Sequence, residues 1–352
     1  MREAILYKKL KIKKHAPHRD EVSGAGVQCR NCAHYCVILP GKRGVCGVRE
    51  NIDGKLYALN YGKAIAYHVD PIEKKPFFHF LPGSYSLSVA TVGCNFSCKN
   101  CQNYDISQAP KPQRPVFGED LPPEEIVNIA LKNKLPSISY TYTEPAIFSE
   151  YALETMKLAK ENGLKNNWVT NGFWSKELFD LISPCLDAAN VDLKSFSDEF
   201  YTSNCGGRLQ PVLDTLKRLK EKKIWVEITT LSIPTLSDSE EMFRSIAKFI
   251  KEELGQETPW HITQFSGVIS WKLKDLPDTP VETLEKAYKI GKETGLKYVY
   301  TGNVPGLPSE DTFCPKCGAL CIDRTNYVIH RHDKNGKCQK CGENLDLILN
   351  PV

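Results

Sequence analysis

The sequence predicts an α/β protein whose central part is a partial (β/α) barrel, with small cysteine-rich metal-binding segments at both ends. Between about residues 85 and 303, short β-rich runs alternate with helical stretches, which is typical of a parallel sheet covered by helices. The 14 cysteines fall mostly into three tight groups, one near each end of the chain and one inside the alternating region. Such grouping indicates metal sites, because one loop can then present several thiolates together.

The alternating region supplies enough units for a barrel. Its predicted strands are Ser86–Val92, Ser137–Tyr142, Asn166–Thr170, Ala188–Leu193, Ile224–Thr230, His261–Phe265 and Tyr298–Tyr300. The predicted helices between them are Glu124–Asn133, Ile147–Glu161, Gln210–Lys222, Glu240–Leu254 and Val281–Thr294. The first of these helices has a favourable N-terminus, because prolines precede it and acidic residues occupy its first turn. Six or seven such units fit a complete or partial barrel better than a small open sheet.

Composition excludes several classes of protein. With 46 Lys and Arg against 42 Asp and Glu, the net charge of +4 is too small to argue for nucleic-acid binding by itself. No apolar run approaches the ~18 residues that cross a bilayer. The basic segment Met1–Asp20 lacks the apolar stretch of a secretory signal. We therefore expect a cytoplasmic protein without a membrane partner, whose reduced thiols bind metal or take part in chemistry.

The central group, Cys94-x3-Cys98-x2-Cys101, directly follows the first predicted strand through Gly93. Three thiolates can hold three irons of a [4Fe–4S] cluster and leave the fourth iron without a protein ligand. An open metal position is what a catalytic site needs, and barrel active sites lie on loops after the carboxyl ends of strands. The alternative is a zinc knuckle whose fourth ligand lies elsewhere.

This central run resembles the cluster motif of the radical S-adenosylmethionine (SAM) superfamily. The resemblance implies that the amino and carboxylate groups of SAM chelate the open iron. One electron then cleaves SAM to methionine and a 5′-deoxyadenosyl radical, which abstracts a hydrogen atom from the substrate. One position departs from the family pattern, because many members have an aromatic residue before the third cysteine and this chain has Asn100.

The resemblance also implies a SAM pocket at the ends of later strands. Thr141-Tyr-Thr-Glu144-Pro145 resembles the segment that meets the SAM amino group. Thr170-Asn171-Gly172 and Asp192-Leu-Lys194 resemble segments of pyruvate formate-lyase activating enzymes, and His261 matches a family histidine near the adenosyl group. The implied pocket residues are Glu144, Thr170, Asn171, Asp192, Lys194 and His261.

In those activating enzymes, carboxylates near the same two segments hold a monovalent cation beside SAM. This chain keeps Asp192 but has Val169 where the other carboxylate would stand. The resemblance therefore leaves a cation site open at this end of the barrel.

Further segments resemble the radical SAM enzymes of the AmmeMemoRadiSam system, which are similar to pyruvate formate-lyase activating enzymes. The resemblance covers about residues 20–345. It rests on Val45–Asn51, Asp70–Pro76, His79–Gly83, Gly93–Phe96, Cys101–Asn103, Tyr298–Gly306 and the tail. It implies a low-potential electron donor of the flavodoxin or ferredoxin type, a protein as a candidate substrate, and Memo-like and AMMECR-type proteins as candidate partners.

The tail carries two pairs of cysteines, Cys314-x2-Cys317 and Cys338-x2-Cys341, each followed by glycine. This spacing predicts a structural zinc ribbon in which each pair supplies two thiolates to a tetrahedral ion. A rubredoxin-like iron site with the same ligands is the alternative. Cys321 is then a spare thiol, and His330 and His332 are expected as exposed strand residues.

The N-terminal group is Cys29-x2-Cys32-x3-Cys36-x9-Cys46. Four thiolates can hold either zinc or an auxiliary [4Fe–4S] cluster, and we favour structural zinc, with His34 as an optional ligand. Cys185 and Cys205 stand alone in the sequence and are expected to be packed thiols.

These patterns predict an N-terminal four-cysteine segment (1–84), a radical SAM partial barrel (85–309) and a C-terminal zinc ribbon (310–352). The first hypothesis is a radical SAM oxidoreductase similar to glycyl-radical activating enzymes. The second is a zinc-ribbon module that binds nucleic acid or protein without radical chemistry, favoured by Lys8, Lys9, Lys11, Lys13 and Lys14. Nucleic acid is not the expected partner. The third is an electron-transfer scaffold with several clusters.

Overall fold

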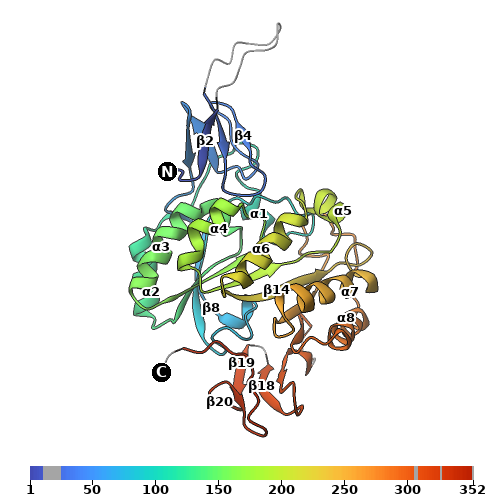
Figure 1. The fold of residues 1–352 in the computed structure, drawn as a ribbon. Helices are drawn as coiled ribbons and strands as arrows, with labels where there is room; N and C mark the ends of the chain where they lie inside the picture. Colours follow the sequence, from blue (N-terminus) through green and yellow to red (C-terminus); the bar gives the residue numbers. More distant parts are fainter. Residues whose placement is uncertain (11–24, 305–307, 326, 351–352) are drawn as a thin grey trace.

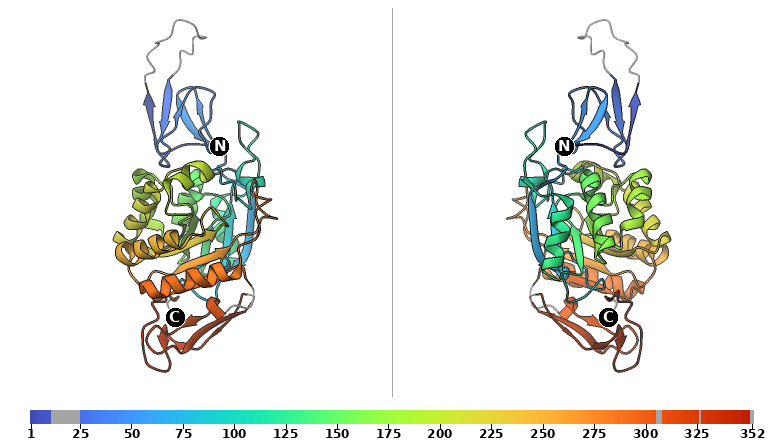
Figure 2. Two further views of the ribbon diagram at one scale, coloured as in Figure 1. Left: turned by 90° about the vertical axis from the view of Figure 1, so that its right-hand side faces the viewer. Right: turned by 90° about the vertical axis from the view of Figure 1, so that its left-hand side faces the viewer.

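The computed structural model describes residues 1–10, 25–304, 308–325 and 327–350. A curved central sheet with its helices forms the body (Figure 1). Two further views show the N-terminal strands at one end of this body and the C-terminal strands at the opposite end (Figure 2). The predicted α/β architecture with a small segment at each end is confirmed.

The central sheet has eight strands in the order β16-β15-β14-β13-β12-β11-β9-β8. The strands of this sheet are β8 (Ala66–Pro71), β9 (Tyr85–Ala90), β11 (Ser137–Tyr140), β12 (Lys165–Thr170), β13 (Ala188–Asp192), β14 (Trp225–Ser232), β15 (Trp260–Gln264) and β16 (Val299–Gly302). All neighbours pair in parallel except β8 with β9. Right-handed crossovers between sequential parallel strands place the crossover helices on one face of the sheet, which is the arrangement of a partial barrel.

Each predicted strand of the barrel is confirmed within two residues, but β8 was missed. Its exposure explains why, because Tyr67, His68 and Val69 are all exposed and the strand shows no apolar alternation. The sheet therefore begins at Ala66, inside the segment predicted to be N-terminal and outside the barrel.

The α-helices of the body are α1 (Tyr104–Ser107), α2 (Pro123–Lys132), α3 (Ser149–Glu161), α4 (Lys176–Ile182), α5 (Asp198–Phe200), α6 (Gln210–Glu221), α7 (Glu240–Phe249) and α8 (Val281–Thr294). Most of them cover the outer face of the sheet (Figure 1). In α7, the Ser239 hydroxyl accepts a hydrogen bond from the Met242 N–H and caps the first turn. Phe243 and Ile246 are fully buried, and each contributes ~1.5–3 kcal/mol of hydrophobic stabilisation. The short helices α1, α4 and α5 were not predicted.

The N-terminal segment consists of small antiparallel sheets. One contains β1 (Arg2–Glu3), β6 (Lys55–Ala58) and β5 (Arg49–Ile52), and another contains β2 (Tyr7–Leu10), β3 (Gly26–Cys29) and β4 (Val37–Ile38). A short pair, β7 (Lys63–Ala64) with β10 (Glu119–Asp120), lies beside the barrel. Of the basic residues that favoured nucleic-acid binding, Lys8 and Lys9 are exposed on β2. The others, Lys11, Lys13 and Lys14, lie outside the described residues.

The C-terminal segment contains β17 (Thr312–Phe313), β18 (Leu320–Thr325), β19 (Val328–Arg331), β20 (Asp333–Lys334) and β21 (Lys337–Cys338). Hydrogen bonds join it to residues 78–81, the segment that precedes β9. The Leu81 N–H donates to the Ile348 carbonyl, the Ile348 N–H donates to the His79 carbonyl, each over 2.8 Å, and Arg324 donates to the Phe78 carbonyl. The tail therefore closes the amino ends of the barrel strands.

Among the described helices, none is both long and apolar enough to pass through a membrane.

Candidate active site

A cavity of about 460 Å³ lies inside the curve of the sheet. Its volume falls within the ~300–1,000 Å³ of ordinary ligand pockets. Parallel strands bring their carboxyl-terminal loops to the same edge of the sheet, so segments far apart in sequence meet there. Its lining includes every residue predicted for the catalytic cluster and the SAM pocket, namely Cys94, Cys98, Cys101, Glu144, Thr170, Asn171, Asp192, Lys194 and His261.

The cysteine loop leaves β9 through Gly93, whose φ of 103° favours glycine. A Cβ at this position would lie 2.9 Å from a Val48 methyl carbon and 3.0 Å from the Cys46 carbonyl oxygen. A contact with a distant part of the chain also fixes the loop, because the Ser97 N–H donates a hydrogen bond to the Cys205 carbonyl over 2.8 Å. The backbone therefore holds the three thiols at the cavity wall before any metal binds.

The three thiols suit a cluster better than a single ion. Burial raises the pKa of Cys94 and of Cys101. A hydrogen bond with Cys205, together with burial, raises the pKa of Cys98. Metal binding at this loop would therefore release protons. In the described part of the chain, the only metal-ligand group with all its atoms within 4.8 Å of one another is in the tail. The wider spacing here fits thiolates that each bind a different iron.

No cysteine other than these three lines the cavity among the described residues. Cys205, predicted to be a packed thiol, is fully buried beside Cys98 and does not line the cavity. A cluster on this loop would therefore keep one iron open toward the cavity. The residues present fit a [4Fe–4S] cluster with three protein ligands.

Glu144 lies at the start of the 3₁₀ helix Pro145–Phe148, where its carboxylate accepts a hydrogen bond from the Ala146 N–H. It also accepts from the Thr170 hydroxyl over 2.7 Å and from the Asn171 N–H over 2.8 Å. Burial raises the pKa of Glu144, while these donors lower it. The carboxylate thus joins the ends of β11 and β12 and keeps acceptor capacity for a ligand in the cavity.

Asn171 connects this carboxylate to the cysteine loop, because its side-chain amide donates to Asn95 Oδ1 over 2.7 Å. At the end of β13, Lys194 Nζ donates to Asp192 Oδ2 over 2.8 Å. Although burial alone would lower it, the Asp192 carboxylate and the Cys98 thiol raise the pKa of Lys194. The charge of Asp192 is therefore balanced by lysine, and the cation site that the resemblance left open gains no support from this geometry.

His261 lines the cavity, and its Nε2 lies 2.7 Å from Oε2 of Glu227, a residue of β14 that sequence reasoning missed. Glu227 is fully buried and also accepts from the backbone N–H groups of Phe78, His79 and Phe80. Although burial alone would raise it, these contacts lower the pKa of Glu227 to about 2. In the sequence, the signal for this residue is a single charged side chain in an otherwise uncharged strand. Its role is to orient His261 and to anchor the segment below the cavity.

We expect Glu227→Gln to destabilise the protein at pH 7 by about 3 kcal/mol, because an amide replaces a carboxylate that accepts five hydrogen bonds. A lowered pKa adds stability above the unfolded pKa near 4.5, and this stability disappears as the pH falls toward about 2. Urea unfolding at pH 7, 5, 4 and 3 should therefore show a difference that shrinks only below about pH 4.5. The matched control is Glu285→Gln on the exposed side of α8. An equal difference at all pH values would contradict this account.

A second polar cluster lies under the cavity and was also missed. Asp70 of β8 accepts hydrogen bonds from Lys74, Lys75, Ser88 and the hydroxyl of Tyr142. Although burial alone would raise it, these donors hold the pKa of Asp70 well below its usual range. Burial lowers the pKa of Lys75, whose side chain is among those that line the cavity.

The tail cysteines come together as predicted. Cys314 Sγ lies 3.5 Å from Cys341 Sγ, and Cys317 Sγ lies 3.7 Å from Cys338 Sγ. All four ligand atoms lie within 4.8 Å of one another, a spacing that could hold one metal ion. Cys321 is buried beside this group without being part of it.

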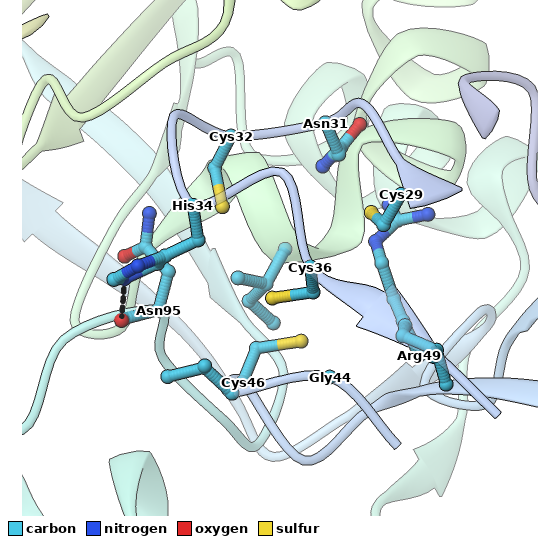
Figure 3. A pocket seen from close by; sticks show the side chains of 12 residues that line it. Cys29, Asn31, Cys32, His34, Cys36, Gly44, Cys46, Arg49 and Asn95 are labelled. Carbon is cyan, nitrogen blue, oxygen red and sulfur yellow. Dashed lines mark hydrogen bonds between the residues drawn. The ribbon is translucent and has the colours of Figure 1, made fainter. Parts of the chain in front are cut away.

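The N-terminal cysteines, Cys29, Cys32, Cys36 and Cys46, line a second cavity (Figure 3). His34 belongs to the same lining, but its Nε2 lies 2.9 Å from the Asn95 carbonyl oxygen instead of completing a ligand set. Cys185, predicted to be a packed thiol, is partly exposed and lines neither cavity.

Comparison with known proteins bears on this geometry. Residues 88–250 match the family model of the radical SAM superfamily. The chain is 44% identical to "Uncharacterized protein MJ0808" of Methanocaldococcus jannaschii over 99% of this chain and 100% of the relative. It is 29% identical to "Putative glycyl-radical enzyme activating enzyme MJ1632" of the same organism, over 61% and 79% of the two chains. It is 25% identical to the pyruvate formate-lyase-activating enzyme of Clostridium pasteurianum, over 57% and 87%.

The fold and the matched region define a protein with a radical SAM domain, homologous to glycyl-radical and pyruvate formate-lyase activating enzymes. The chain belongs to the same family as MJ0808, and its residues 88–250 form a radical SAM domain. The superfamily implies SAM and an iron–sulfur cluster as cofactors.

Proposed function

We propose that this chain is a radical SAM oxidoreductase that cleaves SAM reductively at a [4Fe–4S] cluster and abstracts hydrogen from a substrate. Cys94, Cys98 and Cys101 would hold the cluster. The observation that carries the proposal is a single cavity that gathers these three thiols with the predicted SAM-pocket residues. When bound, the cluster and SAM supply the radical chemistry, while the chain positions them and limits access of water.

Residues of the chain would orient SAM. The buried Glu144 carboxylate faces the cavity with acceptor capacity that suits an ammonium group. Asn171 links Glu144 to the cysteine loop, so the cluster ligands and the amino-group site are held in one network. His261 is fixed by Glu227 on the far side of the cavity, where it could meet the adenosyl group.

Anaerobic reconstitution with iron and sulfide tests the proposal. We expect an EPR signal from the reduced cluster that shifts on addition of SAM, and 5′-deoxyadenosine under reducing conditions. An EPR signal that does not change on addition of SAM, together with no formation of 5′-deoxyadenosine, would argue against the proposal.

A protein is the favoured substrate, by likeness to relatives that carry the name of activating enzymes. We further propose membership of the AmmeMemoRadiSam system, a cytoplasmic location, an electron donor of the flavodoxin or ferredoxin type, and Memo-like and AMMECR-type partners. Co-purification of the tagged chain with those two proteins from a cell that contains all three tests the partnership. Absence of both from the eluate would count against it.

For the tail we propose zinc. The Sγ distances of 3.5 and 3.7 Å support it, because four thiolates around one tetrahedral ion at ~2.3 Å stand roughly 3.8 Å apart. A ribbon of this size gains most of its folding energy from its metal.

We expect Glu144→Gln to weaken SAM binding by at least tenfold, because a charge-assisted hydrogen bond is worth ~1.5–3 kcal/mol. The glutamine amide would also face the Asn171 N–H or another donor of the same network. Titration of SAM into reconstituted protein, followed by EPR, measures the affinity. Glu154→Gln, on the partly exposed side of α3, is the matched control. Unchanged SAM affinity in Glu144→Gln would show that Glu144 does not bind SAM.

A further inference from the structure

The spacing of the N-terminal thiols differs from the spacing in the tail. Four thiolates on one zinc ion stand roughly 3.8 Å apart, as the tail cysteines do. In the described chain, the N-terminal cysteines form no group whose ligand atoms lie within 4.8 Å of one another. The four side chains line one small cavity, and their sulfur atoms face it (Figure 3). Thiolates that each bind a different iron need this wider arrangement.

We propose that Cys29, Cys32, Cys36 and Cys46 hold an auxiliary [4Fe–4S] cluster, in place of the zinc that the sequence favoured, and that this cluster passes electrons to the catalytic centre. The second part rests on the proposed function, whereas the first does not.

The other groups in the cavity wall support a cluster. Arg49 is buried with only 2% of its side chain exposed, and its outer nitrogens bind the Glu150 carboxylate at 2.5 and 2.9 Å. Its Nε has no partner among the described residues, and neither does Nδ2 of the buried Asn95. Both residues line the cavity. Buried N–H groups without partners are costly, and sulfur atoms of a cluster would accept from them and tune its potential.

The number of ligands indicates the role of this cluster. Four cysteines satisfy all four irons, so no iron stays open for SAM or a substrate. A fully ligated cluster transfers electrons. Val45, which lines the cavity, is 48% exposed, so the site lies close to the surface where an electron carrier can approach.

The cavity shares a wall with the active site. Asn95 lines the N-terminal cavity, while its chain neighbour Cys94 lines the active-site cavity. His34, between Cys32 and Cys36, contacts the Asn95 carbonyl through Nε2 at 2.9 Å, and the Ala33 N–H donates to the Phe173 carbonyl. One electron would leave the reduced auxiliary cluster and enter the catalytic cluster. A reduced carrier of the ferredoxin or flavodoxin type would then restore the auxiliary cluster, with no proton or atom transferred.

The test uses the full chain carrying Cys94→Ala, Cys98→Ala and Cys101→Ala, which removes the catalytic ligands and leaves the N-terminal group intact. After anaerobic reconstitution we expect about four irons and about one zinc per chain, and an EPR signal on reduction that SAM does not alter. About two zincs with no iron would overturn the proposal, whatever the wild type does with SAM. Wild-type protein should contain about eight irons. Cys185→Ala, outside both cavities, is the matched control.

The relay is measured by the rate at which a reduced ferredoxin or flavodoxin reduces the catalytic cluster, followed by absorbance without SAM turnover. We expect Cys36→Ser with Cys46→Ser to slow this reduction at least tenfold relative to wild type. Equal rates in a folded double variant that has lost the second set of irons would overturn the relay. If that variant fails to fold, the relay is tested in the wild type, where the auxiliary cluster should be reduced before the catalytic cluster, and the reverse order would overturn it.

Discussion

Replacing Cys98 by alanine is expected to lower SAM cleavage by at least about a thousandfold, equivalent to about 4 kcal/mol, with little change in folding. Cys98 is buried in the loop that leaves β9, and its thiol is one of only three cysteine thiols that face the active-site cavity in the described chain. A cluster with three protein ligands already has one open iron, so loss of another ligand leaves two anchors. The chemistry fails because the cofactor is lost, not because the barrel is disturbed.

Three measurements on anaerobically reconstituted protein separate these causes. 5′-Deoxyadenosine formation reports the chemistry, iron content reports the cluster, and far-UV circular dichroism reports the fold. Cys185→Ala is the matched control, because it removes a thiol that lines neither cavity. If Cys98→Ala kept its full iron content and its SAM cleavage, the cluster assignment of the central loop would be wrong.

Much of the barrel could be predicted because its strands obey simple rules. Buried runs such as Ala188–Asp192 are apolar along most of their length, and the intervening helices carry one apolar face. The family resemblance implied Glu144 and Asn171 as pocket residues, and they line one cavity with Cys94 because all three follow the carboxyl ends of barrel strands.

What was missed depends on contacts that no local pattern encodes. The edge strand β8 is exposed over half its length, so its composition is that of a loop. The role of Glu227 depends on three backbone N–H groups that the distant segment Phe78–Phe80 donates to it. The difference between the two terminal cysteine groups is a difference of Sγ spacing, and sequence spacing alone could not distinguish them.

Replacing Cys338 by serine, or removing with a chelator the zinc ion that we propose for the tail, is expected to unfold the C-terminal segment and to destabilise residues 78–80 beside the active site. The tail has a small core, in which Cys314, Cys321 and Cys338 are buried with Ile322 and Leu345. A structural zinc ion contributes ~10–16 kcal/mol of apparent binding energy to folding, far more than such a core provides. Without the metal, the strands β18 and β19 should lose their protection from exchange.

The loss of structure in the tail should affect the barrel through hydrogen bonds between the two segments. Ile348 pairs with His79 and Leu81, and Arg324 holds the Phe78 carbonyl. The N–H groups of Phe78, His79 and Phe80 donate to Glu227, which in turn orients His261. Amide exchange of residues 78–80 therefore reports whether the tail supports the SAM pocket.

Hydrogen exchange followed by mass spectrometry measures both effects on one sample. We expect Cys338→Ser to lower protection in 312–325 and 327–349 by at least a hundredfold. Protection in 78–80 should fall by a smaller factor, because these amides still donate to Glu227 of the barrel. Cys321→Ser is the matched control, since this buried thiol lies beside the four ligands without belonging to their group. Equal loss in both variants would assign the effect to packing instead of metal. Unchanged protection in Cys338→Ser would mean that the tail folds without its ion.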